Sequence, residues 1–326
     1  MMIEKIITAF ILFFSGSSVT PAIVENNFAF RELTIPYLQQ QSYESNLGEL
    51  TKYQENSNYT SYLTNYDSEG LKINGLLTIP DGDIPEGGFP AIVFVHGYIP
   101  LTEYRTTEKY VAYVDALAKS GFVVFKIDLR GHGNSEGEAG GAYYSSDYII
   151  DTLNAYSALE SFEKVNKDKI GLWGHSMAGN VTFRSVAVKK DIPAVVIWGG
   201  AGFTYTDFLE YGIGDNSYRP PNNDSERARK RRQLMEYYGQ YDPDSWFWKQ
   251  VTPINFLEGV TTKLELHHAV NDDVVDIEYS RNLNKMLDDT KIIHNLYEYQ
   301  SGGHNITGTA FTQAMQRTVG FFKNNL

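Results

Sequence analysis

Residues 169–179 read KIGLWGHSMAG, an apolar run that leads into a serine among small residues. The apolar run 169–173 is typical of a buried strand, and a helical pattern follows Gly179. A serine on a tight turn from strand to helix holds its hydroxyl above the sheet, and its neighbours must be small because the turn is strained. The sequence therefore predicts that Ser176 is a nucleophile. Ala178 stands where the usual pattern has glycine, and alanine lacks only glycine's freedom at positive φ.

Short apolar runs on both sides of this stretch indicate further strands. They cover residues 91–95, 121–127, 169–173, 194–198 and 263–267, each bounded by turn signals. Continuous runs of this length suit strands that are buried on both faces of a parallel sheet. Residues 107–119 and 148–162 are predicted helices, and residues 71–80 alternate like a half-exposed antiparallel strand. The alternation predicts an α/β protein with a mostly parallel, doubly wound sheet, whose functional loops follow the carboxyl ends of the strands.

Changes in composition divide the chain into segments. In residues 1–22, Lys5 precedes the apolar run 6–14 and the small residues 15–18, which is the order of a secretory signal. We therefore expect export to a periplasmic or extracellular location; an uncleaved anchor or a packed first helix is the alternative. The polar residues 23–60 are interpreted as a linker or an appendage on the core.

The main domain is expected over residues 61–326. Within it, residues 202–259 interrupt the strand–helix alternation and are too long for a plain connection. Leu234, Tyr237, Tyr238 and Tyr241 recur there at helical spacing. We interpret residues 202–259 as a mostly helical cap inserted over the sheet.

The nucleophile needs a base, because a serine hydroxyl alone is weakly reactive. The chain order serine, acid, histidine accompanies this kind of turn. Of the seven histidines, only His304 combines a late position with a loop, before the terminal helix. An acid between Ser176 and His304 would hold the histidine tautomer and stabilise the imidazolium. The candidates for it are Asp272, Asp273 and Asp276.

Attack by this serine on a carbonyl group would create an oxyanion, which needs backbone N–H donors. One donor is expected from Met177, the residue after the nucleophile. The other is expected from the loop after residues 91–95, which reads His96-Gly97-Tyr98. We choose the N–H of Tyr98; the alternative is that Tyr98 only lines the pocket with its ring.

The bulk properties exclude several classes of partner and site. The formal charge of -12 at pH 7 disfavours nucleic acid and anionic lipid surfaces. The absence of cysteine excludes disulfides and thiolate metal sites. The histidines and acids show no metal-binding spacing, so neither a metal nor a cofactor is expected. The basic run 227–232 could bind an acidic substrate group, lipid headgroups or nucleic acid; we favour the solvated face of a cap helix.

Several motifs together resemble the catalytic domain of the prolyl oligopeptidase-like and feruloyl-esterase-like α/β-hydrolases. They are His96-Gly97, the D-x-R-G-x-G-x-S loop at 128–135, the turn at Ser176, the stretch 252–275 and Gly303-His304. The resemblance covers about residue 65 to the C-terminus. It implies the α/β-hydrolase fold. Through that group's H-G-x-x-D-D-x-V-P pattern, it implies Asp272 rather than Asp273 as the acid, although Ala269 and Asp276 replace its glycine and proline.

The resemblance also implies a serine hydrolase that acts through an acyl-enzyme, and we expect a carboxylic-ester hydrolase of small molecules. The large peptidases of this group carry a β-propeller, and residues 23–60 are too short for even a few four-stranded blades. Selectivity is therefore expected from the cap, with a substrate pocket formed by Tyr237, Tyr238, Trp246 and Trp248. A serine peptidase or amidase that uses the same residues is the alternative. No stable membrane span is expected, because the apolar run at the N-terminus is short.

Overall fold

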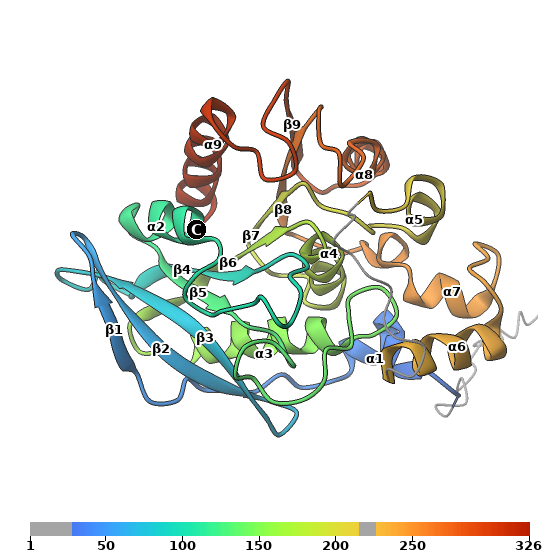
Figure 1. Ribbon diagram of the computed structural model, residues 1–326, viewed down its shortest axis with the longest axis horizontal. Helices are drawn as coiled ribbons and strands as arrows, with labels where there is room; N and C mark the ends of the chain where they lie inside the picture. Colours follow the sequence, from blue (N-terminus) through green and yellow to red (C-terminus); the bar gives the residue numbers. More distant parts are fainter. Residues whose placement is uncertain (1–27, 215–225) are drawn as a thin grey trace, which may run out of the picture.

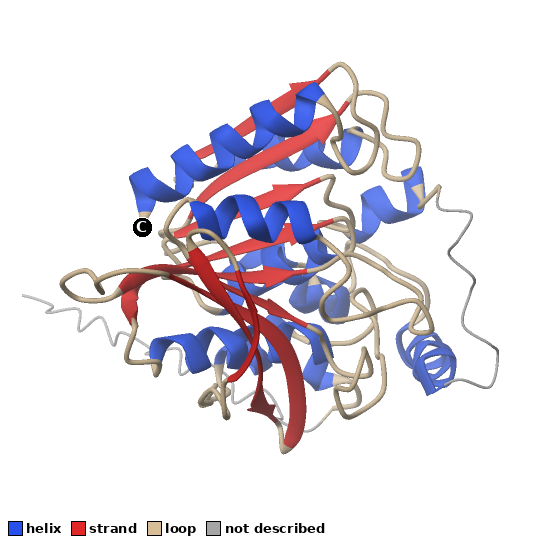
Figure 2. Ribbon diagram, turned by 60° about the vertical axis from the view of Figure 1, so that its left-hand side comes forward, coloured by secondary structure: helices blue, strands red, loops and turns tan. Residues whose placement is uncertain are grey.

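The computed structural model describes residues 28–214 and 226–326, and these residues form one nine-stranded sheet with helices on both faces (Figures 1 and 2). The strand order is β1-β2-β3-β5-β4-β6-β7-β8-β9. Pairs from β1 to β5 are antiparallel, and pairs from β5 through β4 to β9 are parallel. This confirms the predicted α/β class with its mostly parallel, doubly wound sheet. The predicted signal at residues 1–22 lies outside the described residues.

Strands β3 to β8 coincide with the predicted runs, whereas β1 and β2 were not predicted. Their bounds are β1 Thr51–Glu55, β2 Tyr59–Ser68, β3 Leu71–Pro80, β4 Phe89–Val95, β5 Val123–Ile127, β6 Val165–His175, β7 Ala194–Trp198, β8 Lys263–Ala269 and β9 His294–Tyr299. The prediction that residues 71–80 are half exposed is wrong, because the last six residues of β3 are all buried. Because successive strand residues point to opposite faces of the sheet, both faces of this part of β3 are covered.

The core has two layers because successive strand residues point to opposite faces of the sheet. Val93 and Val95 of β4 belong to one buried cluster, and Ile92 and Phe94 belong to the other. Helices α2 Val111–Lys119 and α9 Thr309–Asn325 cover the second cluster. Four helices cover the first: α1 Ile35–Gln39, α3 Asp147–Glu160, α4 Ala178–Val188 and α8 Glu278–Asp288. The described part of residues 23–60 thus adds helix α1 to the core and strand β1 to the sheet.

The described part of residues 202–259 is helical, and it follows β7 and precedes β8. It contains α5 Tyr205–Tyr211, α6 Glu226–Tyr238, α7 Trp246–Val251 and the 3-10 turn η2 Pro253–Phe256. Figure 1 shows α6 and α7 side by side at one end of the molecule, close to α1. A separate buried cluster joins them to the 3-10 turn η1 Arg31–Leu33. None of the helices in residues 28–214 and 226–326 is long and apolar enough to cross a membrane.

Candidate active site

Ser176 lies on the turn between β6 and α4 and has a φ of 57°, which is the left-handed region that L residues rarely adopt. Three backbone hydrogen bonds hold this turn. The N–H of Ser176 donates to the carbonyl of Trp198 at 3.0 Å, and its carbonyl accepts from the N–H groups of Gly179 at 2.8 Å and Ala201 at 3.1 Å. Such strain persists only where surrounding contacts over-determine it. The bonds to β7 and the loop after it supply that constraint.

The small residues around Ser176 are required by close backbone approach. A Cβ atom on Gly174 would lie 2.8 Å from a side-chain carbon of Thr182. A Cβ atom on Gly179 would lie 2.8 Å from the Cα of Gly200. The close approach of helix to sheet therefore falls at Gly179, one position after the usual glycine, and Ala178 is accommodated as a fully buried residue.

Asp272 and His304 meet at the carboxyl ends of the neighbouring parallel strands β8 and β9. Nδ1 of His304 lies 2.8 Å from Oδ2 of Asp272, whose side chain is 1% exposed. Oδ1 of Asp272 accepts the backbone N–H groups of Val274 and Val275, both at 2.9 Å. Of the two adjacent aspartates, Asp272 is thus the one that contacts His304.

A second histidine, His268, also contacts this carboxylate, with Nε2 3.2 Å from Oδ2 of Asp272. Burial favours the neutral acid, but hydrogen bonds from His268 and His304 outweigh it and lower the pKa of Asp272 below its usual value. An ionised Asp272 accepts the Nδ1–H of His304. This leaves the Nε2 lone pair of His304 as a proton acceptor.

One cavity of about 600 Å³ contains Ser176 and His304 in its lining, together with Tyr98 and Met177. The residues predicted as nucleophile, base and oxyanion hole therefore line one cavity. Asp272 does not line it but contacts His304. Six of the lining residues are tyrosine or phenylalanine: Tyr98, Tyr110, Tyr113, Tyr143, Tyr144 and Phe208. Within the described residues, no cluster of three or more histidines and acids could hold a metal ion.

The four aromatic residues that the sequence assigned to the pocket lie elsewhere, and none is in the cavity wall. Tyr238 stacks on Phe247 with ring centroids 3.7 Å apart, and Trp248 is fully buried. Trp246 and Tyr237 contact the rings of Phe28 and Phe30, respectively. Tyr237, Tyr238 and Trp246 thus attach helices α6 and α7 to the N-terminal segment. Trp248 packs against Tyr205 and Tyr241.

Two residues that the sequence did not assign to the site join its parts. Burial lowers the pKa of His175 to about 3, so its ring is neutral near pH 7. Its Nε2 donates to the carbonyl of His304 at 2.9 Å, which leaves its Nδ1 to accept the hydroxyl of Tyr110 at 2.8 Å. The Tyr110 oxygen in turn accepts the N–H of Gly97 at 3.0 Å. This chain of bonds links the loop before Tyr98, the serine turn and the histidine loop.

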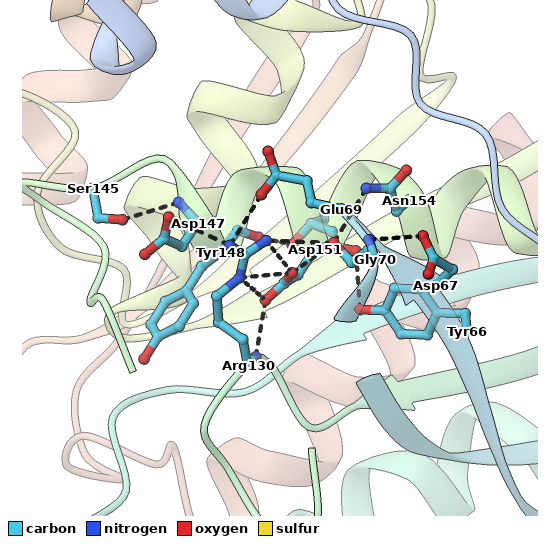
Figure 3. A network of polar contacts seen from close by, with 12 residues as sticks. Tyr66, Asp67, Glu69, Gly70, Arg130, Ser145, Asp147, Tyr148, Asp151 and Asn154 are labelled. Atoms are coloured by element: carbon cyan, nitrogen blue, oxygen red, sulfur yellow. Dashed lines mark hydrogen bonds and ion pairs between the residues drawn. The ribbon is translucent and has the colours of Figure 1, made fainter. Parts of the chain in front are cut away.

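The D-x-R-G-x-G-x-S loop supports the site from outside it. Figure 3 shows the Arg130 guanidinium against the carboxylate of Asp151 on α3, with Glu69 and Asp147 nearby. The Nη2–Oδ1 distance to the fully buried Asp151 is 2.7 Å. The carbonyl of Asp128, two residues earlier, lies 3.0 Å from Nε2 of His96. The loop therefore anchors the segment that leads to Tyr98.

Two family models of hydrolases match this chain. The family model described as "Serine aminopeptidase, S33" matches residues 89–207. The model described as "BAAT / Acyl-CoA thioester hydrolase C terminal" matches residues 153–322, just over half of the chain. Among curated proteins, an uncharacterized 31.7 kDa protein of Escherichia coli is 26% identical over 161 residues, which are 49% of each chain. The chain thus spans about half the length of this relative.

Two solved structures illustrate the likeness in fold. The acetyl xylan esterase from Paenibacillus sp. R4 superposes with a TM-score of 0.62 at 15% identity, covering 90% of this chain and 92% of that one. The acylaminoacyl peptidase of Pyrococcus horikoshii gives 0.63 at 19% identity, covering 83% and 42%. The chain therefore belongs to the α/β-hydrolases, a group of esterases and peptidases, and within them to the family of the acyl-CoA thioester hydrolase C-terminal model.

Proposed function

We propose that this protein hydrolyses carboxylic esters through an acyl-enzyme, with Ser176 as nucleophile, His304 as base and Asp272 as the acid that orients the base. One observation carries the proposal. His304, bonded through Nδ1 to Asp272, lies in the wall of the cavity that also contains Ser176. A serine, a histidine and a buried carboxylate in these roles form the general pattern of nucleophilic serine catalysis.

The proposed reaction has two halves. Nε2 of His304 takes the proton of Ser176 as Oγ bonds to the ester carbon and the carbonyl electron pair moves to oxygen. The backbone N–H groups of Met177 and Tyr98 stabilise that oxyanion. When it collapses, the bond to the alcohol oxygen breaks and His304 returns the proton to the alcohol. Water then adds to the acyl carbon while His304 takes its proton, and Ser176 leaves with that proton as the acid is released.

The cavity favours esters over peptides with a free amino terminus. A protonated amino group needs a carboxylate or several acceptors when it enters an apolar site. None of the described residues that line the cavity is Asp or Glu, and two of them, Lys109 and Arg231, are cationic. A cationic peptide terminus would therefore be repelled, whereas an ester requires only the oxyanion donors and apolar surface.

Matched substrates test the proposal. We expect the wild type to hydrolyse 4-nitrophenyl butyrate much faster than the corresponding 4-nitroanilide, and to leave alanine 4-nitroanilide intact. Ser176→Ala should reduce ester turnover on the order of a million-fold. Ser57→Ala, at an exposed serine between β1 and β2, is the matched control and should keep full activity. Faster cleavage of the anilides would establish a peptidase or amidase instead, and full activity of Ser176→Ala would refute the nucleophile.

A further inference from the structure

The cavity beside Ser176 is lined by two cationic side chains and, among the described residues, by no acidic one. Lys109 comes from the segment before α2, and Arg231 comes from the cap helix α6. The protein as a whole carries a formal charge of -12. A local surplus of positive charge in an acidic protein opposes the overall field and attracts anions to one place.

Arg231 is oriented by an aromatic ring and is not neutralised by a carboxylate of the described residues. Its guanidinium carbon lies 4.8 Å from the ring centroid of Tyr144, which also lines the cavity. Stacking on an aromatic face leaves the in-plane N–H groups of a guanidinium available. No carboxylate of the described residues lies within ion-pair distance of Arg231, although Arg130 and Arg281 elsewhere in the chain each have two or more acidic partners.

Lys109, the second cationic residue in the cavity wall, also has no described carboxylate as a partner. It is half-buried, and no ion pair with a described carboxylate involves it. The next residue, Tyr110, is held by its hydroxyl between Gly97 and His175, so the backbone beside Lys109 has a defined position relative to the serine turn. A half-buried ammonium without a counter-ion gains from an anion that enters the cavity.

We propose that the substrate is an ester that carries an anionic group, such as a carboxylate, remote from the scissile carbonyl, and that Arg231 and Lys109 bind this group. The proposal rests on the proposed ester hydrolysis at Ser176. Residues 229–232 of the basic run are exposed, as expected for a solvated face, and the proposal assigns Arg231 of this face to the substrate site. The aromatic wall contacts the apolar part of the substrate, and the two cations determine which esters are preferred.

Two pairs of neutral and anionic esters test the inference. The first pair is 4-acetoxybenzoate and 4-acetoxybenzamide, which place the charge on the alcohol side. The second pair is the 4-nitrophenyl monoester of adipic acid and its terminal amide, which place the charge on the acyl side. We expect kcat/KM to favour the anionic member of at least one pair about tenfold or more, because a hydrogen bond to a charged group contributes that much.

Variants assign the preference to the two cations. Arg231→Gln and Lys109→Gln should each reduce the anionic-to-neutral ratio several-fold, and the double variant should bring it close to one. Arg229→Gln is the matched control, because it removes the same charge from an exposed position on the same helix that does not line the cavity. The wild-type ratio should also fall as the salt concentration rises, since charges near solvent are screened; this measurement does not depend on any variant being folded.

The outcomes separate this inference from the proposed function. If neutral esters are cleaved in a Ser176-dependent manner but neither anionic ester is preferred, ester hydrolysis stands and the anion site is refuted. A preference that persists in the double variant, or falls equally in Arg229→Gln, also refutes it. If no ester is cleaved in a Ser176-dependent manner, both proposals fail.

Discussion

Replacement of Asp272 by asparagine isolates the orientation of the base. In Asp272→Asn, the amide oxygen can still accept the N–H groups of Val274 and Val275, so the loop keeps its two 2.9 Å bonds. The amide nitrogen then faces Nδ1 of His304, 2.8 Å away, as a donor where an acceptor is needed. His304 must carry its proton on Nε2, and it can no longer accept the proton of Ser176.

The expected loss is therefore catalytic rather than structural. A wrong tautomer costs about ten-thousand-fold in turnover, or about 5.5 kcal/mol of transition-state stabilisation. The assay is kcat for 4-nitrophenyl butyrate near pH 7.5, with circular dichroism to verify folding. Asp273→Asn changes the exposed neighbouring carboxylate and should retain activity within a few-fold. A larger loss in Asp273→Asn than in Asp272→Asn would show that the catalytic pairing differs from the one in the structure.

The same carboxylate predicts a pH-dependent contribution to folding. The pKa of Asp272 is lower in the folded protein than its ordinary value of 3.8. Its ionised form therefore stabilises the fold fully above the unfolded-state pKa, and the contribution is lost as the pH falls through the folded-state pKa. The difference in urea midpoint between wild type and Asp272→Asn should be constant above about pH 5 and should narrow below about pH 4. A gap that widens on acidification would contradict the sign of the shift.

Three further substitutions test the supporting structure. Tyr110→Phe removes the hydroxyl that joins Gly97 to the serine turn. It should lower kcat and reduce the free energy of unfolding in urea by about 1–3 kcal/mol, whereas unchanged values would refute the link. Gly179→Ala should destabilise the fold by about 1–3 kcal/mol, because the added Cβ overlaps the backbone at Gly200. Gly320→Ala, where a Cβ meets open space in helix α9, should stabilise the fold by up to about 1 kcal/mol. Equal effects of the two substitutions would contradict the packing argument. Arg130→Met should cost about 3–5 kcal/mol by leaving Asp151 unpaired, and adding Asp151→Leu should recover part of that loss.

Local patterns in the sequence were sufficient for strands β3 to β8 and for the choice of Ser176 and His304 as candidate site residues. The runs that became β4 and β7 are apolar throughout, and β5 has a single lysine, because strands buried on both faces have few polar positions. Ser176 could be found because a strained strand-to-helix turn demands small residues within a few positions of the serine. His304 could be found because the sequence places it late in the chain, in a loop before the terminal helix.

Residues whose role depends on contacts between distant parts of the chain could not be identified from local sequence patterns. Position along the chain left Asp272, Asp273 and Asp276 as candidates, and only the family resemblance implied Asp272. In the structure, the N–H groups of Val274 and Val275 hold the Asp272 carboxylate beside His304. His175 and Tyr110 lie 65 residues apart and have no shared motif. Their hydrogen bond exists only because the segment before α2 packs against the serine turn.

Residues 202–259 best illustrate the difference between what helical spacing predicts and what packing determines. Helical spacing in the sequence predicted that residues 202–259 hold helices rich in aromatic side chains, and the described part of the segment is helical. Spacing determines which residues share a helix face, but not which face is turned to the cavity. Contacts with Phe28 and Phe30, some 200 residues earlier, hold Trp246 and Tyr237 against the N-terminal segment. Only that packing placed Arg231, rather than the cap's aromatic residues, in the wall beside Ser176.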